Sequence, residues 1–245
     1  MHQTREPSIL YFGTPVVVIS TLNDDGTPNL APMSSAFWLG WRCVLGLGAS
    51  SQTAGNLRRR RECVLNLPSQ HLVTEVDRLA LTTGAHPVPA FKAARGYRHV
   101  ADKFAAAGLH PQASTTVAPP RVQECPVQME AVVEAIHGVA DDDERLRGHI
   151  LNIEVRVQRI HLHPSILMDG HTDRVDPDKW RPLIMSFQKF YGLGDQQLRS
   201  STLSSIPEAA YRSPDVDRAR LAPSIVQPAR QLSPADALAC DEASE

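Results

Sequence analysis

Two stretches of alternating apolar and polar residues, 127–140 and 148–163, constrain the fold of this chain more than any other feature. In the second stretch Leu151, Ile153 and Val155 are each followed by a polar residue. A period of two predicts strands, and the acidic run 141–144 between the stretches predicts a turn. Long strands joined by hairpins indicate an antiparallel sheet that closes as a barrel.

Shorter strands are predicted in the N-terminal half. Residues 15–21 are a run of β-branched residues, which predicts a strand buried on both sides. The Asn-Asp-Asp-Gly sequence at 23–26 predicts a hairpin turn. Residues 28–32 contain two prolines, which favour an edge strand or a loop. Residues 35–48 read as a hairpin or a bent strand, and residues 63–67 as a further strand.

Short helices are predicted between these strands. Residues 50–53 offer N-cap side chains for a helix over 54–60. Ser69 caps a second helix, which Gly84 is expected to end, and residues 101–107 form a third. The fold class is therefore mainly β with short helices (α+β), as an antiparallel split β-barrel.

Apolar residues become sparse after residue 194. We therefore expect one domain over 1–194 and a largely irregular C-terminal extension over 195–245. Within it, 213–245 is predicted to be a poorly packed tail, with helical turns near 234–240.

The composition narrows the classes of function. A net charge of −2 gives no reason to expect nucleic acid or an anionic membrane as partner, and 5% aromatic residues argue against stacking on single-stranded nucleic acid. No apolar run approaches the ~20 residues that span a bilayer, and the N-terminus lacks the pattern of a signal peptide. Four dispersed cysteines, Cys43, Cys63, Cys125 and Cys240, are expected to be reduced thiols. Together these features predict a cytoplasmic protein.

Two turns carry small hydroxyl residues. Ser50, Ser51 and Thr53 precede a predicted helix, where free N–H groups and hydroxyls suit a phosphate. Plain capping explains the same residues equally well. The turn 32–36 has amides and hydroxyls that suit the edge of a heteroaromatic ring, although it also reads as an ordinary loop.

Other candidates are weaker. The basic run 58–61 has two interpretations: it contacts a phosphate, or it is the end of a helix that faces solvent. His161 and His163 share a strand face but have no further metal ligands at suitable spacing. Cys125 reads as a nucleophile or, more simply, as a buried thiol. No motif for acid–base or nucleophilic catalysis is present, so an enzyme of this sequence needs a cofactor to carry the chemistry.

In combination these segments resemble the flavin reductase-like family of FMN-binding split β-barrels, which includes flavoredoxin and the reductase components of two-component monooxygenases. The resemblance runs from about Ile9 to Gly194 in unchanged order. The matching segments are 15–21, 23–29, 31–35, 51–57, 63–69, 102–104 with 108–109, 119–121 and 124–130.

The resemblance implies a homodimer that binds FMN near the subunit interface. It places Pro32, Met33, Ser34, Ser35 and Ala36 along the isoalloxazine, Ser50, Ser51, Gln52, Thr53 and Asn56 at the ribityl phosphate, and Asn66, Leu67 and Ser69 beside it. Many members carry Lys or Arg where this chain has Gln52. The resemblance therefore leaves any phosphate-binding cation to Arg58, Arg59 or Arg61.

The resemblance also implies the reaction. NADH or NADPH would pass a hydride from nicotinamide C4 to flavin N5, and reduced FMN would serve a monooxygenase or another acceptor. Two alternatives stay open: an FMN-dependent oxidase or reductase of the pyridoxamine-phosphate-oxidase-like type acting on an organic substrate, and a non-catalytic FMN-binding electron carrier. Residues 85–99 are expected to shape the substrate side. The sequence leaves open the choice of nicotinamide and whether FMN is prosthetic or a diffusing substrate.

Overall fold

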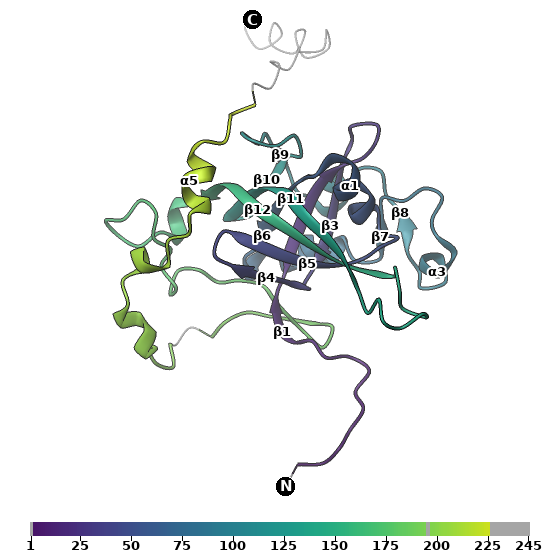
Figure 1. Ribbon diagram of the computed structural model, residues 1–245, viewed down its shortest axis with the longest axis horizontal. Helices are drawn as coiled ribbons and strands as arrows, with labels where there is room; N and C mark the ends of the chain where they lie inside the picture. The colour runs from purple at the N-terminus through teal and green to yellow at the C-terminus, as the bar shows by residue number, and fades with distance from the viewer. Residues whose placement is uncertain (1, 195–196, 226–245) are drawn as a thin grey trace, which may run out of the picture.

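The principal sheet of the computed structural model is antiparallel, and the strand order is β3-β2-β6-β11-β12-β5-β4 (Figure 1). The structure describes residues 2–194 and 197–225. The strands of this sheet are β2 (Val17–Leu22), β3 (Pro28–Met33), β4 (Ala36–Leu39), β5 (Arg42–Gly48), β6 (Glu62–Leu67), β11 (Val127–Val139) and β12 (Ile150–Leu162).

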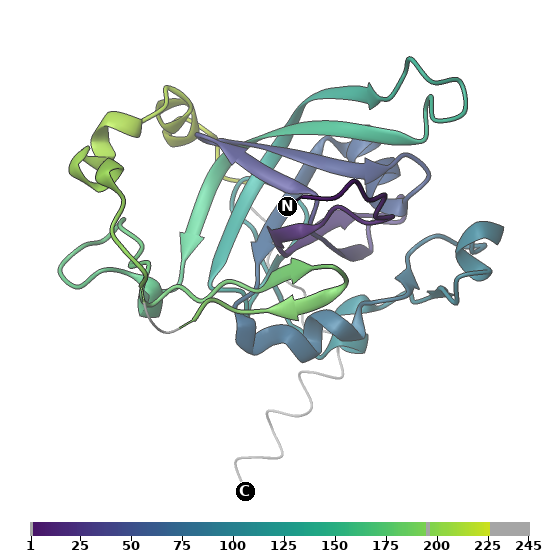
Figure 2. The same cartoon turned by 90° about the horizontal axis from the view of Figure 1, so that it is seen from below.

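The hairpin of β11 and β12 is the centre of the sheet, as the alternating sequence predicts. Each strand has 13 residues, and β11 also pairs with β6 while β12 pairs with β5. Leu151, Ile153 and Val155 of β12 point into the core. Register shifts after Glu130 and Val133 mark irregularities in the pairing, and the two strands curve across the molecule (Figure 2).

Strand β2 is buried on both faces, which confirms the prediction from its β-branched run. Val17 and Ile19 join the larger core cluster inside the barrel, whereas Val18 joins a second cluster together with Val16, the residue before the strand. The second cluster includes Leu79 and Phe104 and lies under the helices α2 (Val73–Arg78) and α4 (Lys103–Ala107). One strand therefore belongs to both cores.

The remaining elements are short. The edge position of β3 and the β4–β5 hairpin agree with the predictions for residues 28–32 and 35–48. The other helices are α1 (Gln52–Arg60), α3 (Ala90–Ala93) and α5 (Asp215–Arg220), with 3₁₀ turns η1 (Gln70–Leu72), η2 (Pro164–Ile166), η3 (Thr202–Ser205) and η4 (Glu208–Tyr211). The other strands are β1 (Phe12–Pro15), β7 (Thr82–Thr83), β8 (Arg98–His99), β9 (Pro111–Gln112), β10 (Arg121–Val122), β13 (Ile184–Ser186) and β14 (Lys189–Tyr191).

The second predicted helix ends earlier than expected. Gly84 was predicted as its last residue, but α2 ends at Arg78 and the chain turns through Leu81, whose φ is +53°. The β-branched residues Thr82 and Thr83 then pair in parallel with Arg98 and His99. Because Thr82 and Thr83 pair as a strand, they are not part of the helix, and Gly84 does not end it.

One part of the C-terminal extension is better packed than the predicted tail over 213–245: α5 buries Asp215 and Ala219, whereas residues 197–212 are exposed. Helix α5 lies beside β12 (Figure 1), and its Asp215 is only 8% exposed. Asp215 accepts hydrogen bonds from Arg42 Nε at 2.9 Å and from Arg218 at 3.2 Å. The helical turns predicted near 234–240 lie outside the described residues. Across the described ranges, no helix is both long and apolar enough to cross a membrane.

Candidate functional site

A cavity of about 790 Å³ lies between strand β3, the first turn of α1 and the segment that follows α2. Residues 79–84 form one wall. Residues 46–48 of β5 form another, together with residues 32–35, which are the end of β3 and its link to β4 and are called the loop 32–35 below. Side chains from 92–103 and from 185–190 complete the rim. A cavity of this size suits a small organic ligand or cofactor.

About half of the predicted site residues line this cavity. Those that line it are Pro32, Met33, Ser34, Ser35, Ser51, Gln52 and Thr53. Those that do not are Ala36, Ser50, Asn56, Asn66, Leu67 and Ser69. The structure therefore brings together the two hydroxyl-rich turns and leaves the third predicted group outside.

The first turn of α1 presents free N–H groups to the cavity. Ser51 is the N-cap residue, and its Oγ accepts a hydrogen bond from Ala54 N at 3.1 Å. The capping interpretation of Ser51 is thus correct. The N–H groups of Gln52 and Thr53 have no partner among the described residues, so this turn can still receive an anion.

The loop 32–35 is held against β5 by a glycine. Gly46 N donates to Ser35 O at 2.8 Å, and a Cβ on Gly46 would lie 3.1 Å from the Cβ of Ser35. The close approach fixes the loop along one wall of the cavity.

Two of the predicted asparagines have structural partners instead. Asn56 Nδ2 donates to Thr21 Oγ1 and to Asn23 Oδ1, both at 3.0 Å, which ties α1 to the β2–β3 turn. Asn66 donates to Val18 O at 3.0 Å and accepts from Val122 N at 2.8 Å. Ser69 caps η1 through His71 N. These contacts account for the three side chains without a ligand.

Asn29 and Gly84 are cavity residues that the sequence reasoning missed. Asn29 is 2% exposed; its Nδ2 donates to Thr53 Oγ1 at 3.2 Å, and its Oδ1 has no partner among the described residues. A Cβ on Gly84 would lie 2.5 Å from that oxygen, so only glycine permits this close approach. A buried acceptor without a donor is costly to stability.

The basic residues that line the cavity were also not predicted from the sequence. They are Lys92, Arg95 and Lys103, and one acidic residue, Asp77, lines the cavity with them. Burial, and next the charge of Lys92, lowers the pKa of Lys103 to about 8. Lys103 lies in a segment that matched the family pattern, but only its tertiary position shows that it lines the cavity.

The basic run at the end of α1 lies elsewhere. Arg59 pairs with Asp24 and donates to Asn56 Oδ1 at 2.7 Å. Arg60 donates to backbone carbonyls of the β2–β3 turn, and Arg61 donates to Val133 O at 2.9 Å. None of Arg58, Arg59, Arg60 and Arg61 lines the cavity.

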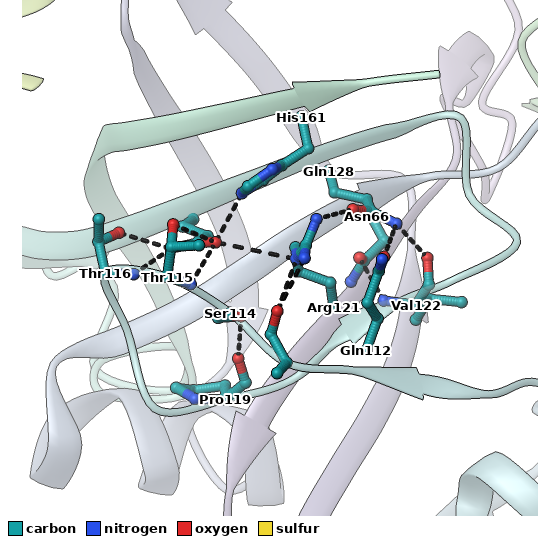
Figure 3. Close-up of polar contacts among 12 residues, drawn as sticks. Asn66, Gln112, Ser114, Thr115, Thr116, Pro119, Arg121, Val122, Gln128 and His161 are labelled. Carbon is teal, nitrogen blue, oxygen red and sulfur yellow. Dashed lines mark hydrogen bonds and ion pairs between the residues drawn. The ribbon is translucent and has the colours of Figure 1, made fainter. Parts of the chain in front are cut away.

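A second polar cluster is centred on Glu130 of β11, and Figure 3 labels its partners Thr115, Thr116 and His161. Its carboxylate accepts hydrogen bonds from Thr115 N at 2.8 Å, from Thr116 Oγ1 at 2.6 Å and from His161 Nε2 at 2.7 Å. Arg121 lies 3.9 Å away. His161 therefore has a carboxylate partner. Throughout residues 2–194 and 197–225, no three His, Cys, Asp or Glu side chains are grouped to hold a metal ion.

Cys125 is buried, as expected of an inert thiol. It is 4% exposed, and burial raises its pKa, so the thiol stays protonated at neutral pH. Cys43 and Cys63 are also buried and free, while Cys240 lies outside the described residues.

The strand order and the central hairpin are those of an antiparallel split β-barrel. A family model described as "Flavin reductase like domain" matches residues 9–193. The chain therefore belongs to the flavin reductase-like family.

The chain is similar to a known sequence and shares its fold with solved structures. The uncharacterized protein YdfE of Bacillus subtilis (strain 168) is 38% identical over 189 residues, which are 77% of this chain and 88% of YdfE. The flavoredoxin of Desulfovibrio vulgaris (Miyazaki F) superposes with a TM-score of 0.65 at 19% identity, covering 83% of this chain and 100% of the flavoredoxin. Nitrilotriacetate monooxygenase component B from Bacillus cereus superposes with a TM-score of 0.61 at 19% identity, covering 78% of this chain and 88% of component B.

Proposed function

We propose that this protein is an FMN-binding oxidoreductase that uses NADH or NADPH to reduce the flavin and supplies reduced flavin to a monooxygenase or another acceptor. Membership of the flavin reductase-like family supports a flavin-related oxidoreductase. The particular flavin, the nicotinamide and the acceptor are our proposals.

The observation that carries the proposal is the chemistry of the cavity wall. Flavin mononucleotide has a flat ring with polar edges, a polyol chain and a phosphate. The wall offers backbone groups of the loop 32–35 for a ring edge, hydroxyl side chains of the two turns for the polyol chain, and the free N–H groups of Gln52 and Thr53 for an anion. Each part of FMN thus has a complementary group in one cavity.

The residues of the wall would bind and orient the cofactor without acid–base catalysis. When bound, FMN supplies the redox chemistry, because its ring accepts hydride from a nicotinamide. The rigid β3–β5 wall positions the ligand, and backbone N–H groups of residues 33–35 stabilise negative charge at the ring edge. The sequence shows no motif for a catalytic triad or a carboxylate pair, which is consistent with a protein that binds and orients the cofactor while FMN carries the redox chemistry.

The test is an anaerobic titration of the purified protein. We expect FMN to bind with a shift of the flavin spectrum and a rise in Tm, and NADH or NADPH to bleach the flavin absorbance with saturable kinetics. A protein that neither binds FMN nor oxidises either nicotinamide contradicts the proposal.

The same titration separates the two alternatives. An oxidase or reductase acting on an organic substrate is expected to keep FMN bound through turnover and to be reduced slowly by nicotinamides alone. An electron carrier is expected to bind FMN but to show no saturable oxidation of NADH or NADPH.

We also propose a homodimer. The edge strand β4 exposes 53% of Phe37 and 73% of Leu39, and β4 follows directly on the loop 32–35 of the cavity wall. Covering these side chains with a second copy would remove apolar surface from water beside the cavity.

A further inference from the structure

Residues 92–97, called the rim turn below, form a tight backbone turn at the rim of the cavity. The carbonyl oxygen of Lys92 accepts hydrogen bonds from Arg95 N at 2.9 Å and from Tyr97 N at 3.0 Å. Gly96 has a φ of +82°, which a residue with a Cβ rarely adopts and which lets the chain fold back on Lys92. Lys92, Arg95 and Tyr97 thus meet around one carbonyl group, and all three residues line the cavity.

The rim turn is fixed beside the wall formed by residues 79–84. Strand β8 follows it directly and pairs with β7, and Val100 N donates to Thr83 O at 3.0 Å. Lys92 Nζ reaches the same wall, 3.5 Å from Thr83 Oγ1. Figures 1 and 2 both show α3 and β8 at one end of the molecule. The rim turn therefore holds its side chains at a defined place on the cavity.

The two cations of the rim turn have no carboxylate partners. In the part of the chain that the structure describes, neither Lys92 nor Arg95 forms an ion pair. Lys92 Nζ lies 5.7 Å from the centre of the Tyr97 ring, and burial lowers the pKa of Lys92. Because a partly buried cation without a counterion is disfavoured, an anion at this rim would stabilise it.

The proposed contacts of FMN do not use the rim turn. They involve the two hydroxyl-rich turns and the N–H groups of Gln52 and Thr53, which belong to other elements. Two cations beside an aromatic side chain suit a second ligand, in which a phosphate lies close to a heteroaromatic ring. NADH and NADPH both contain adenosine, but NADPH alone carries a phosphate on the adenosine 2′-oxygen.

We propose that Lys92 and Arg95 bind the 2′-phosphate of NADPH, with Tyr97 against the adenine, and that the protein therefore prefers NADPH to NADH. The inference rests on the proposed function, since it takes a nicotinamide as the electron donor. The 2′-phosphate would gain charge-assisted hydrogen bonds that NADH cannot make. No bond forms or breaks at this phosphate, so the two cations determine specificity and take no part in the hydride transfer.

The experiment compares the two nicotinamides in matched variants at saturating FMN. kcat and KM are measured for the wild type, Lys92→Met and Arg95→Met. We expect kcat/KM for NADPH to fall at least tenfold in each variant, through KM, and kcat/KM for NADH to change less than threefold. Arg98→Met is the control and should change neither, because Arg98 lies in β8 directly after the rim turn but does not line the cavity.

Two results overturn the inference. One is a wild type that uses NADH as efficiently as NADPH, and the other is an equal loss of both nicotinamides in the variants. Arg95 is exposed, so Arg95→Met carries the test even if Lys92→Met fails to fold. A selective loss of FMN affinity relative to riboflavin in Arg95→Met would assign the cations to the flavin phosphate and would also overturn the inference.

A binding measurement separates this inference from the proposed function. Adenosine 2′,5′-bisphosphate and adenosine 5′-monophosphate lack the nicotinamide and differ only in the 2′-phosphate. By calorimetry, with and without FMN, we expect the wild type to bind the bisphosphate at least tenfold more tightly, and Arg95→Met to bind the two with similar affinity. That result without flavin reduction keeps the 2′-phosphate site and rejects the proposed function. Flavin reduction by a wild type that binds both nucleotides equally does the reverse.

Discussion

Gly84 and Asn29 form the tightest point of the cavity wall. Asn29 is fixed by Thr53, 24 residues away along the chain, and Gly84 approaches its free oxygen so closely that no Cβ fits between them. The backbone of Gly84 does not require a positive φ, so its small size is the property that matters here. A larger residue would push Asn29 away from its contact with Thr53.

Gly84→Ala is therefore expected to destabilise the protein and to weaken FMN binding. Overpacking typically lowers the free energy of unfolding by about 1–3 kcal/mol, and the displaced Asn29 would no longer hold Thr53 in the first turn of α1. Urea unfolding and an FMN titration measure the two effects. Gly48→Ala is the control, because Gly48 lines the same cavity and a Cβ there meets nothing within 4 Å. Equal FMN affinity in the two variants would contradict the role given to Gly84.

At the level of elements, the loop between β9 and β10 is fastened to the central hairpin by a single carboxylate. Glu130 of β11 accepts hydrogen bonds from Thr115 and Thr116 of this loop and from His161 of β12 (Figure 3). Burial would raise the pKa of Glu130, but the hydrogen bonds from His161, Thr116 and Thr115 outweigh it and lower the pKa to about 2. The loop is thus held by an ionised group inside the protein.

This arrangement predicts a loss of stability in acid. A carboxyl group with an ordinary pKa of 4.5 and a folded pKa of about 2 stabilises the folded state above pH 4.5 and loses that contribution as pH falls toward 2. The full contribution is about 3 kcal/mol, of which about 2 kcal/mol is lost between pH 7 and pH 3. The difference in free energy of unfolding between wild type and Glu130→Gln should shrink by that amount.

Urea titrations at the two pH values measure this difference. Glu134→Gln on the same strand is the control, since Glu134 is partly exposed and pairs with Arg156. An exposed pair contributes less than about 1 kcal/mol. A Glu130→Gln effect of the same size at pH 7 and pH 3 would show that the carboxylate is not ionised in the folded protein.

The elements were predictable where the pattern is local. Alternation in 148–163, the β-branched run 15–21 and the cap at Ser51 each depend on neighbours in the sequence, and each prediction is confirmed. The end of α2 was not predictable, because Thr82 and Thr83 leave the helix to pair with residues 16 positions further on. The roles of Asn29 and Lys103 depend on contacts across 24 and 73 positions, for which no sequence signal exists.

At the scale of the whole molecule, the described part of the C-terminal extension contacts the rest of the protein at several points. Asp215 pairs with Arg42 of β5, which also pairs with Glu154 of β12 at 2.6 Å, and Ile225 N donates to Thr115 O at 2.7 Å. Arg218 also lies 4.0 Å from Glu134, and Glu208 pairs with Arg174. None of these residues lines the cavity. The extension lies beyond the residues that match the family model, so its packing is an addition to the common domain.

Deletion of residues 213–245 is expected to lower the free energy of unfolding without changing flavin affinity. Loss of the partly buried Asp215–Arg42 pair should cost roughly 1–3 kcal/mol, between the values for exposed and buried pairs. Urea unfolding and an FMN titration of the shortened protein test this. Asp215→Asn in the full chain isolates the contribution of the ion pair. A shortened protein that folds normally but binds FMN differently would show that the extension acts on the site.

The proposed homodimer makes a separate prediction for strand β4. Phe37→Glu with Leu39→Glu should convert the dimer to a monomer, because two charges would have to be buried in the interface. Light scattering after size-exclusion chromatography measures the mass. Leu198→Glu, a fully exposed residue of the extension, is the control and should leave the mass unchanged. A wild type that is already monomeric contradicts the proposal.

The order of strands in the sheet also governs how the chain can be assembled during synthesis. The hairpins β2–β3 and β4–β5 are neighbours in the sequence, yet β6, β11 and β12 separate them in the sheet. The first half of the chain therefore reaches its final arrangement only after the β11–β12 hairpin has left the ribosome. Long-range pairing of this kind slows folding and leaves apolar strands uncovered meanwhile. A fragment that ends before residue 127 should consequently aggregate, and refolding of the intact chain should proceed as one late, concerted step.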